Sequence, residues 1–183
     1  MLEVRFHGRG GQGAVTSAEI IAQAAIKQGM RAQAFPSFGP ERRGAPVQAF
    51  LRVSDKPIRL RSKVYKPDSV LILDPTLIAS ANPTAGLKKG GYIIINSNKS
   101  PEELKEMFPG QNIIAVDASK IAREELGVPI TNTTMLGALV RATRVVELST
   151  LEEPVRNRFG VNGQKNINAY TRAYNEATVI EAE

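Results

Sequence analysis

A glycine-rich stretch near the amino terminus constrains the fold of this chain more than any other feature. Residues 7–13 read HGRGGQG and lie between a short apolar run, residues 2–6, and a segment with apolar residues at helical spacing, residues 15–28. Four of the seven residues are glycine, and the spacing G-x-G-x-x-G is made by Gly8, Gly10 and Gly13, with Gly11 as an extra glycine. Glycines allow positive φ angles and a close approach to the main chain, and the first turn of a helix presents free N–H groups. The stretch therefore indicates either a phosphate-binding loop or a tight strand-to-helix turn required only for packing.

The rest of the chain alternates strand-like and helix-like segments. Strands are predicted at residues 2–6, 31–35, 47–53, 69–73, 92–95 and 113–116, and helices at residues 15–28, 76–81, 101–107, 118–126, 135–148 and 164–177. Continuous apolar strands of this kind predict an α/β fold, a three-layer α/β/α sandwich with a mostly parallel sheet and a Rossmann-like glycine loop after the first strand. Residues 58–60 would return as a hairpin arm against residues 47–53, which makes the sheet mixed. The length of 183 residues suits a single domain over residues 1–183.

Local signals suggest where some of these helices begin and end. Thr16 and Glu19 resemble a capping box, and Gly29 is a natural helix stop. Residues 35–46 are rich in Pro and Gly without periodicity and form a long loop, which is more often functional than idle. Asp74 follows a buried strand, where ligand crevices open in α/β folds, although a turn-forming Asp explains it as well. Residues 132–134 (NTT) precede a long helix and suggest N-cap chemistry, with a ligand contact as the alternative.

The composition narrows the chemistry that the chain performs alone. It has no cysteine, which excludes disulfides, thiol nucleophiles and iron–sulfur clusters held by its own thiolates. Its single histidine, His7, has no evident catalytic partner and is expected to be a structural strand residue. No run approaches the roughly 18 apolar residues that span a bilayer, and the start of the chain does not read as a signal peptide. We therefore expect a cytoplasmic protein without membrane contact, metal site or catalytic residues of its own.

The net charge of +6 favours anionic ligands or acidic partners. Nucleic acid is disfavoured because the cations are dispersed, Trp is absent and aromatic residues make up only 5% of the chain. The densest basic stretches are residues 41–44 (ERRG) and residues 59–66. Within the latter, Arg59, Arg61 and Lys63 alternate and would share one face of a strand, so we read them as interface or solvent charges.

The charges after the second predicted strand bear on the ligand of the glycine loop. A dinucleotide fingerprint needs an Asp or Glu about 20 residues on for the ribose hydroxyls, and no acid ends the second strand here. Arg42 and Arg43 follow instead, and adjacent arginines suit a phosphate-bearing ligand. An inter-subunit salt bridge or a solvated loop face would explain the same pair. A Walker A loop is excluded because no lysine followed by Ser or Thr ends the glycine stretch.

Four blocks together resemble a known family. HGRGGQGAVTSAEIIAQAA, AQAFPSFGPERRGAPVQAFLRVSDKPIRLRS, LILDPTL and NTTMLGAL are similar to the γ subunit of pyruvate and related 2-oxoacid:ferredoxin oxidoreductases, over essentially the whole chain. The resemblance implies a complex that oxidatively decarboxylates a 2-oxoacid with coenzyme A, giving an acyl-CoA and reduced ferredoxin. It also implies α, β and δ partner subunits, with thiamine diphosphate in α and β and iron–sulfur clusters in β and δ.

In single-chain relatives, as the resemblance implies, the equivalent domain brings a glycine loop and a basic pair to coenzyme A. The residues that carry this role over are Gly8, Arg9, Gly10, Gly11, Gln12, Gly13, Arg42 and Arg43. Two other functions stay open at this point: a stand-alone enzyme that binds NADP or another nucleotide, and a purely structural assembly subunit with an empty loop. The identity of the 2-oxoacid is not encoded here, because other subunits choose it.

Overall fold

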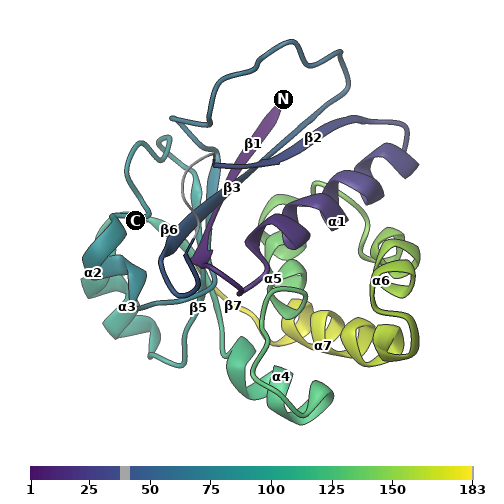
Figure 1. Cartoon of the computed structure of the whole chain (residues 1–183). Helices are drawn as coiled ribbons and strands as arrows, with labels where there is room; N and C mark the ends of the chain where they lie inside the picture. The colour runs from purple at the N-terminus through teal and green to yellow at the C-terminus, as the bar shows by residue number, and fades with distance from the viewer. Residues whose placement is uncertain (38–41, 183) are drawn as a thin grey trace.

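A mixed β-sheet with helices on both faces organises the chain (Figure 1). The computed structural model describes residues 1–37 and 42–182. Within these residues the sheet has seven strands in the order β2-β3-β1-β4-β5-β6-β7. The strands are β1 (Leu2–Arg9), β2 (Arg31–Pro36), β3 (Pro46–Ser54), β4 (Ser69–Ile72), β5 (Tyr92–Asn96), β6 (Asn112–Val116) and β7 (Thr178–Ile180).

The centre of the sheet is parallel, as the continuous apolar runs predict. β1, β4, β5 and β6 pair in parallel, with Phe6 opposite Leu71, Leu71 opposite Ile94 and Ile94 opposite Ile114. These four side chains lie on one face of the sheet and are buried in the larger apolar core, while their neighbours Val70, Ile93 and Ile113 are buried in a second core on the other face. β3 and β7 run in the opposite direction, so the predicted mixed sheet is confirmed.

The predicted hairpin arm at residues 58–60 is wrong. β3 has antiparallel neighbours on both sides, β1 from Leu2 opposite Val53 and β2 from Arg31 opposite Ser54. With both edges of β3 already hydrogen-bonded, residues 58–60 have no strand to pair with. They belong instead to an irregular connection, residues 55–68, which links β3 to β4.

The helices form two unequal layers (Figure 1). One layer packs through the larger apolar core and consists of α1 (Ala14–Lys27), α4 (Ala118–Leu126), α5 (Thr134–Thr143), α6 (Glu152–Phe159) and α7 (Gly163–Glu176), with short 3-10 turns at Leu148–Leu151 and Gly160–Asn162. The other layer consists of α2 (Leu77–Ala81) and α3 (Pro101–Met107), which pack over β4, β5 and β6. The predicted three-layer arrangement therefore holds.

Several helix ends differ from the sequence prediction. α1 begins at Ala14 after Gly13, which has a φ of 82°, and no side chain caps it. The predicted capping box of Thr16 and Glu19 is therefore wrong, because Thr16 already lies inside the first turn. The helix predicted at residues 135–148 ends at Thr143, where Arg144 takes a left-handed conformation. α6 and β7 were not predicted.

None of the helices in the described ranges is both long and apolar enough to cross a membrane. The same ranges hold no cluster of three or more His, Asp or Glu side chains that could bind a metal ion. Part of the predicted long loop at residues 35–46, including Glu41 of the ERRG stretch, lies outside the described residues.

Candidate functional site: the glycine loop at the end of the first strand

The turn between β1 and α1 depends on glycine at three successive points. Gly11 and Gly13 have φ angles of 93° and 82°, a region that residues with a Cβ rarely adopt. Gly10 has an ordinary φ, but a Cβ built on it would lie 2.5 Å from the carbonyl oxygen of Arg42. The backbone N–H of Gly10 donates to the carbonyl of Ala45 over 2.8 Å, and that of Gly44 donates back to Gly10 over 3.1 Å. The glycines thus allow both the sharp turn and a close main-chain contact with the Arg42–Ala45 stretch.

The amino terminus of α1 opens onto a surface hollow beside this turn. The hollow has a volume of about 230 Å³ and is lined by Arg9, Gly10, Gly11, Gly13, Ala14, Val15, Thr16 and Val47. The first N–H groups of a helix have no partner within the helix, and α1 has neither a side-chain cap nor an acidic residue in its first turn. These free donors and the positive end of the helix dipole therefore favour an anion in the hollow.

The side chains of Arg9 and Gln12 connect the glycine loop to the residues that follow β4. The Arg9 guanidinium donates to Asp74 Oδ2 over 3.2 Å, to Thr76 Oγ1 over 2.8 Å and to the Gly44 carbonyl over 3.1 Å. Gln12 Oε1 accepts from the Arg9 backbone N–H at 2.7 Å, and Gln12 Nε2 donates to Asp74 Oδ2 over 3.0 Å. Both side chains are thus engaged within the protein.

Asp74 is the common acceptor of this bracing network. Burial alone would raise its pKa, but hydrogen bonds from Thr76 and Gln12, together with the charge of Arg9, outweigh burial and lower the pKa of Asp74 below its usual value. The carboxylate is therefore ionised at neutral pH and ties the end of β4 to the loop after β1. Gly8 completes the contact, because a Cβ there would lie 3.2 Å from Leu73 Cδ1.

Arg42 and Arg43 lie beside the loop through their main chain. Gly10 and Arg43 form an isolated β-bridge, and the side chains of both arginines are exposed. Neither arginine side chain has a hydrogen bond or ion pair to any other described residue. The structure thus brings together the predicted glycines and the predicted arginine pair, and it leaves both guanidinium groups available.

The residues just before α5 pack against the glycine loop and the start of α1. Thr133 precedes this helix but makes no side-chain cap, so the N-cap role predicted for residues 132–134 is wrong. Asn132 instead lies against the loop, where a Cβ on Gly13 would come within 2.9 Å of Asn132 Cγ. The Asn132 carbonyl accepts a hydrogen bond of 3.2 Å from Ser17 Oγ in α1. Asn132 therefore helps to fix the angle at which α1 leaves the loop.

Arg158, at the end of α6, is a cation at the hollow that was not predicted. Its guanidinium donates to Thr16 Oγ1 over 3.3 Å, and Thr16 lines the hollow. The two residues are 142 positions apart in the sequence. No local pattern signals a contact over such a separation, so only the packing of α6 on α1 reveals it.

His7 has the structural role that its sequence context indicated. It is 1% exposed, and its Nε2 accepts a hydrogen bond of 2.9 Å from Arg5 Nε. Burial and then the charge of Arg5 lower the pKa of His7 to about 3, although a hydrogen bond with the Pro83 backbone acts in the opposite direction. His7 is therefore neutral at physiological pH and buried, away from solvent.

The neighbours of β1 distinguish this site from a dinucleotide-binding fold. In the latter, the second strand lies beside the first, and its carboxyl end supplies an acid for the ribose. Here the antiparallel β3 occupies that place and separates β2 from β1. On this side of β1 the structure therefore lacks the parallel strand whose carboxyl end would supply that acid.

Fold and site together define a class: an α/β chain with a mixed sheet, a glycine loop after its first strand and a helix amino terminus open beside it. The family described as pyruvate ferredoxin/flavodoxin oxidoreductase matches residues 3–176. The chain belongs to this family, and it is similar to the γ subunits within it.

Three relatives document the similarity. The pyruvate/ketoisovalerate oxidoreductases common subunit gamma of Thermococcus kodakarensis is 52% identical over 185 residues, covering 99% of this chain and 100% of the relative. The pyruvate synthase subunit PorC of Methanocaldococcus jannaschii is 49% identical over 177 residues, covering 96% and 97%. The crystal structure of the pyruvate oxidoreductase subunit PORC of Thermotoga maritima superposes with a TM-score of 0.86 at 37% identity and covers 98% of each chain.

Proposed function

We propose that this chain serves a 2-oxoacid:ferredoxin oxidoreductase complex as the γ subunit that supplies part of the coenzyme A site. The open amino terminus of α1 beside the glycine loop carries this proposal, because it presents several N–H donors to one small hollow. Coenzyme A bears a diphosphate and a 3′-phosphate. One phosphate would accept hydrogen bonds from the backbone between Gly11 and Val15, and the guanidinium groups of Arg42 and Arg43 would bind another.

The size of the hollow determines how much of coenzyme A this chain can hold. Its volume of about 230 Å³ is smaller than the roughly 300–1,000 Å³ of pockets that enclose drug-sized ligands. It suits a phosphate group and its immediate neighbours, so the remainder of coenzyme A would lie against other chains. The donor set fits the group, and the site would be completed on assembly.

In the proposed complex the chemistry of 2-oxoacid oxidation belongs to the partner subunits. Thiamine diphosphate would be held by the α and β subunits and iron–sulfur clusters by β and δ, with ferredoxin as the electron acceptor. This chain has no cysteine for a cluster, and its one histidine is buried and neutral. Its residues would bind and orient the coenzyme, in a single cytoplasmic domain over residues 1–183.

Two alternatives have weaker support. A stand-alone NADP enzyme would need a ribose site beside the loop, where β3 lies instead. A purely structural subunit would not need an uncapped helix amino terminus at a hollow beside the main chain of Arg42 and Arg43. Pyruvate is our first choice of substrate, and one relative of this chain is named for both pyruvate and ketoisovalerate.

Kinetics of the assembled complex tests the proposal. In an R42A/R43A variant we expect the KM for coenzyme A to rise by about tenfold or more, because at least one charge-assisted contact with a phosphate is lost. The KM for the 2-oxoacid should not change. A K120A/R123A variant removes two exposed cations from α4 and is the matched control. An unchanged KM for coenzyme A in R42A/R43A would reject the proposed site.

A further inference from the structure

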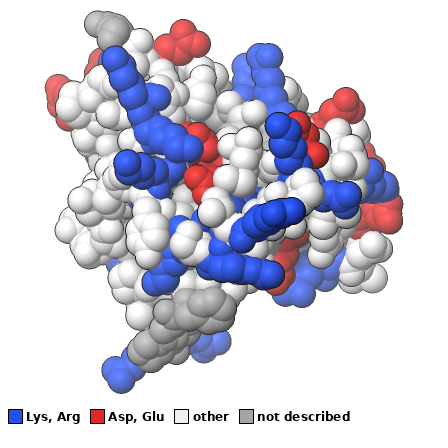
Figure 2. Space-filling model, turned by 90° about the horizontal axis from the view of Figure 1, so that it is seen from above, with Lys and Arg blue, Asp and Glu red and all other residues white. Residues whose placement is uncertain are grey.

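A basic surface lies at the end of the sheet opposite to the glycine loop. The irregular connection between β3 and β4 and the turn before β5 lie at the edge where β1 begins, and Lys and Arg side chains gather on this face of the molecule (Figure 2). Six exposed cations form what we call the basic face: Lys56, Arg59, Arg61, Lys63, Lys66 and Lys89. β1 is eight residues long, so about 25 Å of strand separates this face from the glycine loop.

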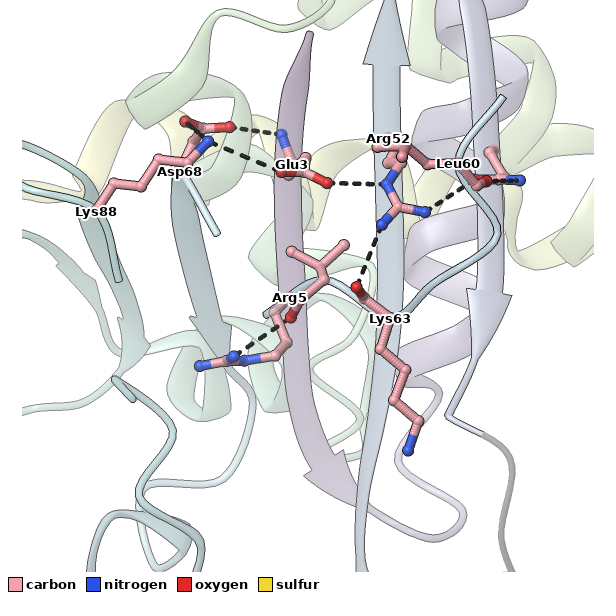
Figure 3. Close-up of polar contacts among 9 residues, drawn as sticks. Glu3, Arg5, Arg52, Leu60, Lys63, Asp68 and Lys88 are labelled. Carbon is pink, nitrogen blue, oxygen red and sulfur yellow. Dashed lines mark hydrogen bonds and ion pairs between the residues drawn. The ribbon is translucent and has the colours of Figure 1, made fainter. Parts of the chain in front are cut away.

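Two carboxylates at this edge, Glu3 and Asp68, are already paired with other cations, whereas the exposed Asp55 has no cationic partner among the described residues. Glu3 accepts from the buried Arg52 guanidinium at 2.9 Å, and Asp68 accepts from Lys88 at 2.8 Å (Figure 3). Asp68 also accepts from the Glu3 backbone N–H at 2.8 Å. Among the described residues, none of the six cations of the basic face has an acidic partner. Their charge is therefore directed at solvent or at another molecule.

Two buried arginines donate hydrogen bonds to the main chain of the connection. Arg52 is 1% exposed and donates to the Lys63 carbonyl over 3.3 Å (Figure 3). Arg5 donates to the Val64 carbonyl over 3.4 Å, and the Val64 side chain is itself buried. Burying guanidinium groups costs desolvation energy, and each of these two groups directs one N–H donor at the main chain of the connection. A surface fixed in this way loses little conformational entropy when a partner binds.

The basic face also exposes apolar groups between its cations. Tyr65 is 70% exposed and Leu60 is 45% exposed, and both lie in the connection. Tyr and Arg are enriched at protein interfaces, whereas a surface for stacking nucleotides would present several aromatic rings. The combination of unpaired cations, a fixed backbone and isolated apolar side chains matches a protein surface rich in Asp and Glu.

We infer that the basic face is the docking surface for an acidic surface on another subunit of the same complex. The inference rests on the proposed place of this chain in a multisubunit oxidoreductase. The inference places one subunit interface at the end of the sheet remote from the proposed coenzyme A site. It also states that the partner's surface there is acidic.

Charge reversal in the co-expressed complex tests the inference. The variant R59E/R61E/K63E reverses three charges on the basic face. The control K120E/R123E/K165E reverses three exposed charges on α4 and α7. The γ chain carries an affinity tag, and the amount of partner chain retained per γ chain is measured at NaCl concentrations from about 0.05 to 0.5 M, a range over which exposed charges become screened.

We expect the basic-face variant to retain about tenfold less partner at low salt, and the control to remain within about twofold of wild type. Retention by wild type should fall as NaCl rises. Circular dichroism and thermal unfolding of each full-length γ chain establish that the variants fold. If the triple Glu variant does not fold, R59Q/R61Q/K63Q replaces it, with an expected loss of about threefold or more. Equal retention by the basic-face variant and the control would overturn the inference.

Other occupants of the basic face would give different results. Normal assembly with a raised KM for ferredoxin in the basic-face variant would overturn the assignment to a stable subunit. Wild-type binding to phosphatidylserine vesicles or to a 20-base-pair DNA duplex, lost in the variant while assembly persists, would also overturn it. The KM for coenzyme A, measured in the same preparations, keeps the two proposals separate, because it should stay at the wild-type value in every assembled basic-face variant.

Discussion

Gly10 and Arg42 contact each other so closely through their main chains that a Cβ atom on Gly10 would lie 2.5 Å from the Arg42 carbonyl oxygen. The contact couples the glycine loop to the arginine pair across a gap of more than thirty positions in the sequence. It means that the two parts of the proposed coenzyme A site cannot move independently.

Gly10→Ala should therefore displace the Arg42–Ala45 stretch. Overpacking of this kind costs about 1–3 kcal/mol, so the free energy of unfolding should fall by that amount and the KM for coenzyme A should rise. Gly29→Ala is the control, since Gly29 has a φ of 82° and open space for a Cβ. It should cost about 1–2 kcal/mol without altering the KM. A Gly10→Ala enzyme with the wild-type KM would show that the contact does not shape the site.

Gly13→Ala should be destabilising for two separable reasons. The positive φ costs about 1–2 kcal/mol, and the new Cβ would crowd the Asn132 side chain. Asn132→Ala removes the second cause only. Urea unfolding of both single variants and the double variant should give a coupling energy of about 0.5–3 kcal/mol, with the double variant less destabilised than the sum. Strict additivity would mean that Asn132 does not restrain the start of α1.

Asp74→Asn should weaken the brace behind the loop. It removes the charge that accepts from Arg9, and loss of such a charge-assisted bond costs about 1.5–3 kcal/mol. The pKa of Asp74 is lowered in the folded state, so its contribution is present above the ordinary carboxyl pKa and is lost as the pH falls through the lowered value. Urea unfolding at pH 7 measures the loss. Asp55→Asn, at an exposed turn, should change stability by no more than about 0.5 kcal/mol.

His7 should make the protein less stable in mild acid. Its folded-state pKa of about 3 lies below the ordinary value of 6.5, so between these values the unfolded chain binds a proton that the folded chain does not. Stability should fall by up to about 1.4 kcal/mol for each pH unit below 6.5. His7→Gln keeps polar hydrogen-bonding groups without this titration, and its stability should vary less steeply with pH. Equal slopes from pH 6.5 to 4.5 would contradict the role given to His7.

The parallel centre of the sheet could be predicted because its strands carry their signal locally. The strands Ser69–Ile72, Tyr92–Asn96 and Asn112–Val116 each contain a continuous apolar run, as is typical of strands buried on both faces. β7 has only three residues and two of them are exposed, so its pairing with β6 left no pattern to read. Tertiary packing gives β3 its partners, β1 and β2. Local spacing had instead suggested residues 58–60 as the partner of β3.

Helix starts show the limit of local motifs. The pattern S/T-x-x-E recurs along the sequence; at Ser100 it forms a capping box with Glu103, whereas at Thr16 it does not. Pro101 follows Ser100 directly and favours a helix start there. Ahead of Thr16, Ala14 and Val15 simply extend the helix back to the glycine loop. Whether this motif forms a capping box therefore depends on the residues around it.

For the site, the sequence predicted the glycines and the arginine pair but not what holds them. Asp74 has its predicted turn role, because its Oδ1 accepts from the Thr76 backbone N–H at 3.0 Å, and it also contacts the loop. At Asn132 the predicted cap is replaced by a contact with the loop. These contacts join residues more than sixty positions apart, and Arg158 reaches Thr16 from still further along the chain. No spacing rule reports such contacts, because they arise only when α1 and its neighbours pack.

A structure of the assembled complex with coenzyme A bound is the decisive test of the coenzyme A site proposed beside α1. We expect one phosphate within hydrogen-bond distance, about 2.7–3.2 Å, of backbone N–H groups among Gly11, Gly13, Ala14 and Val15. We expect a second phosphate at Arg42 and Arg43, with the rest of the coenzyme against a partner subunit. Coenzyme A bound elsewhere in the complex, with the hollow beside α1 filled by a partner side chain, would contradict the proposed site.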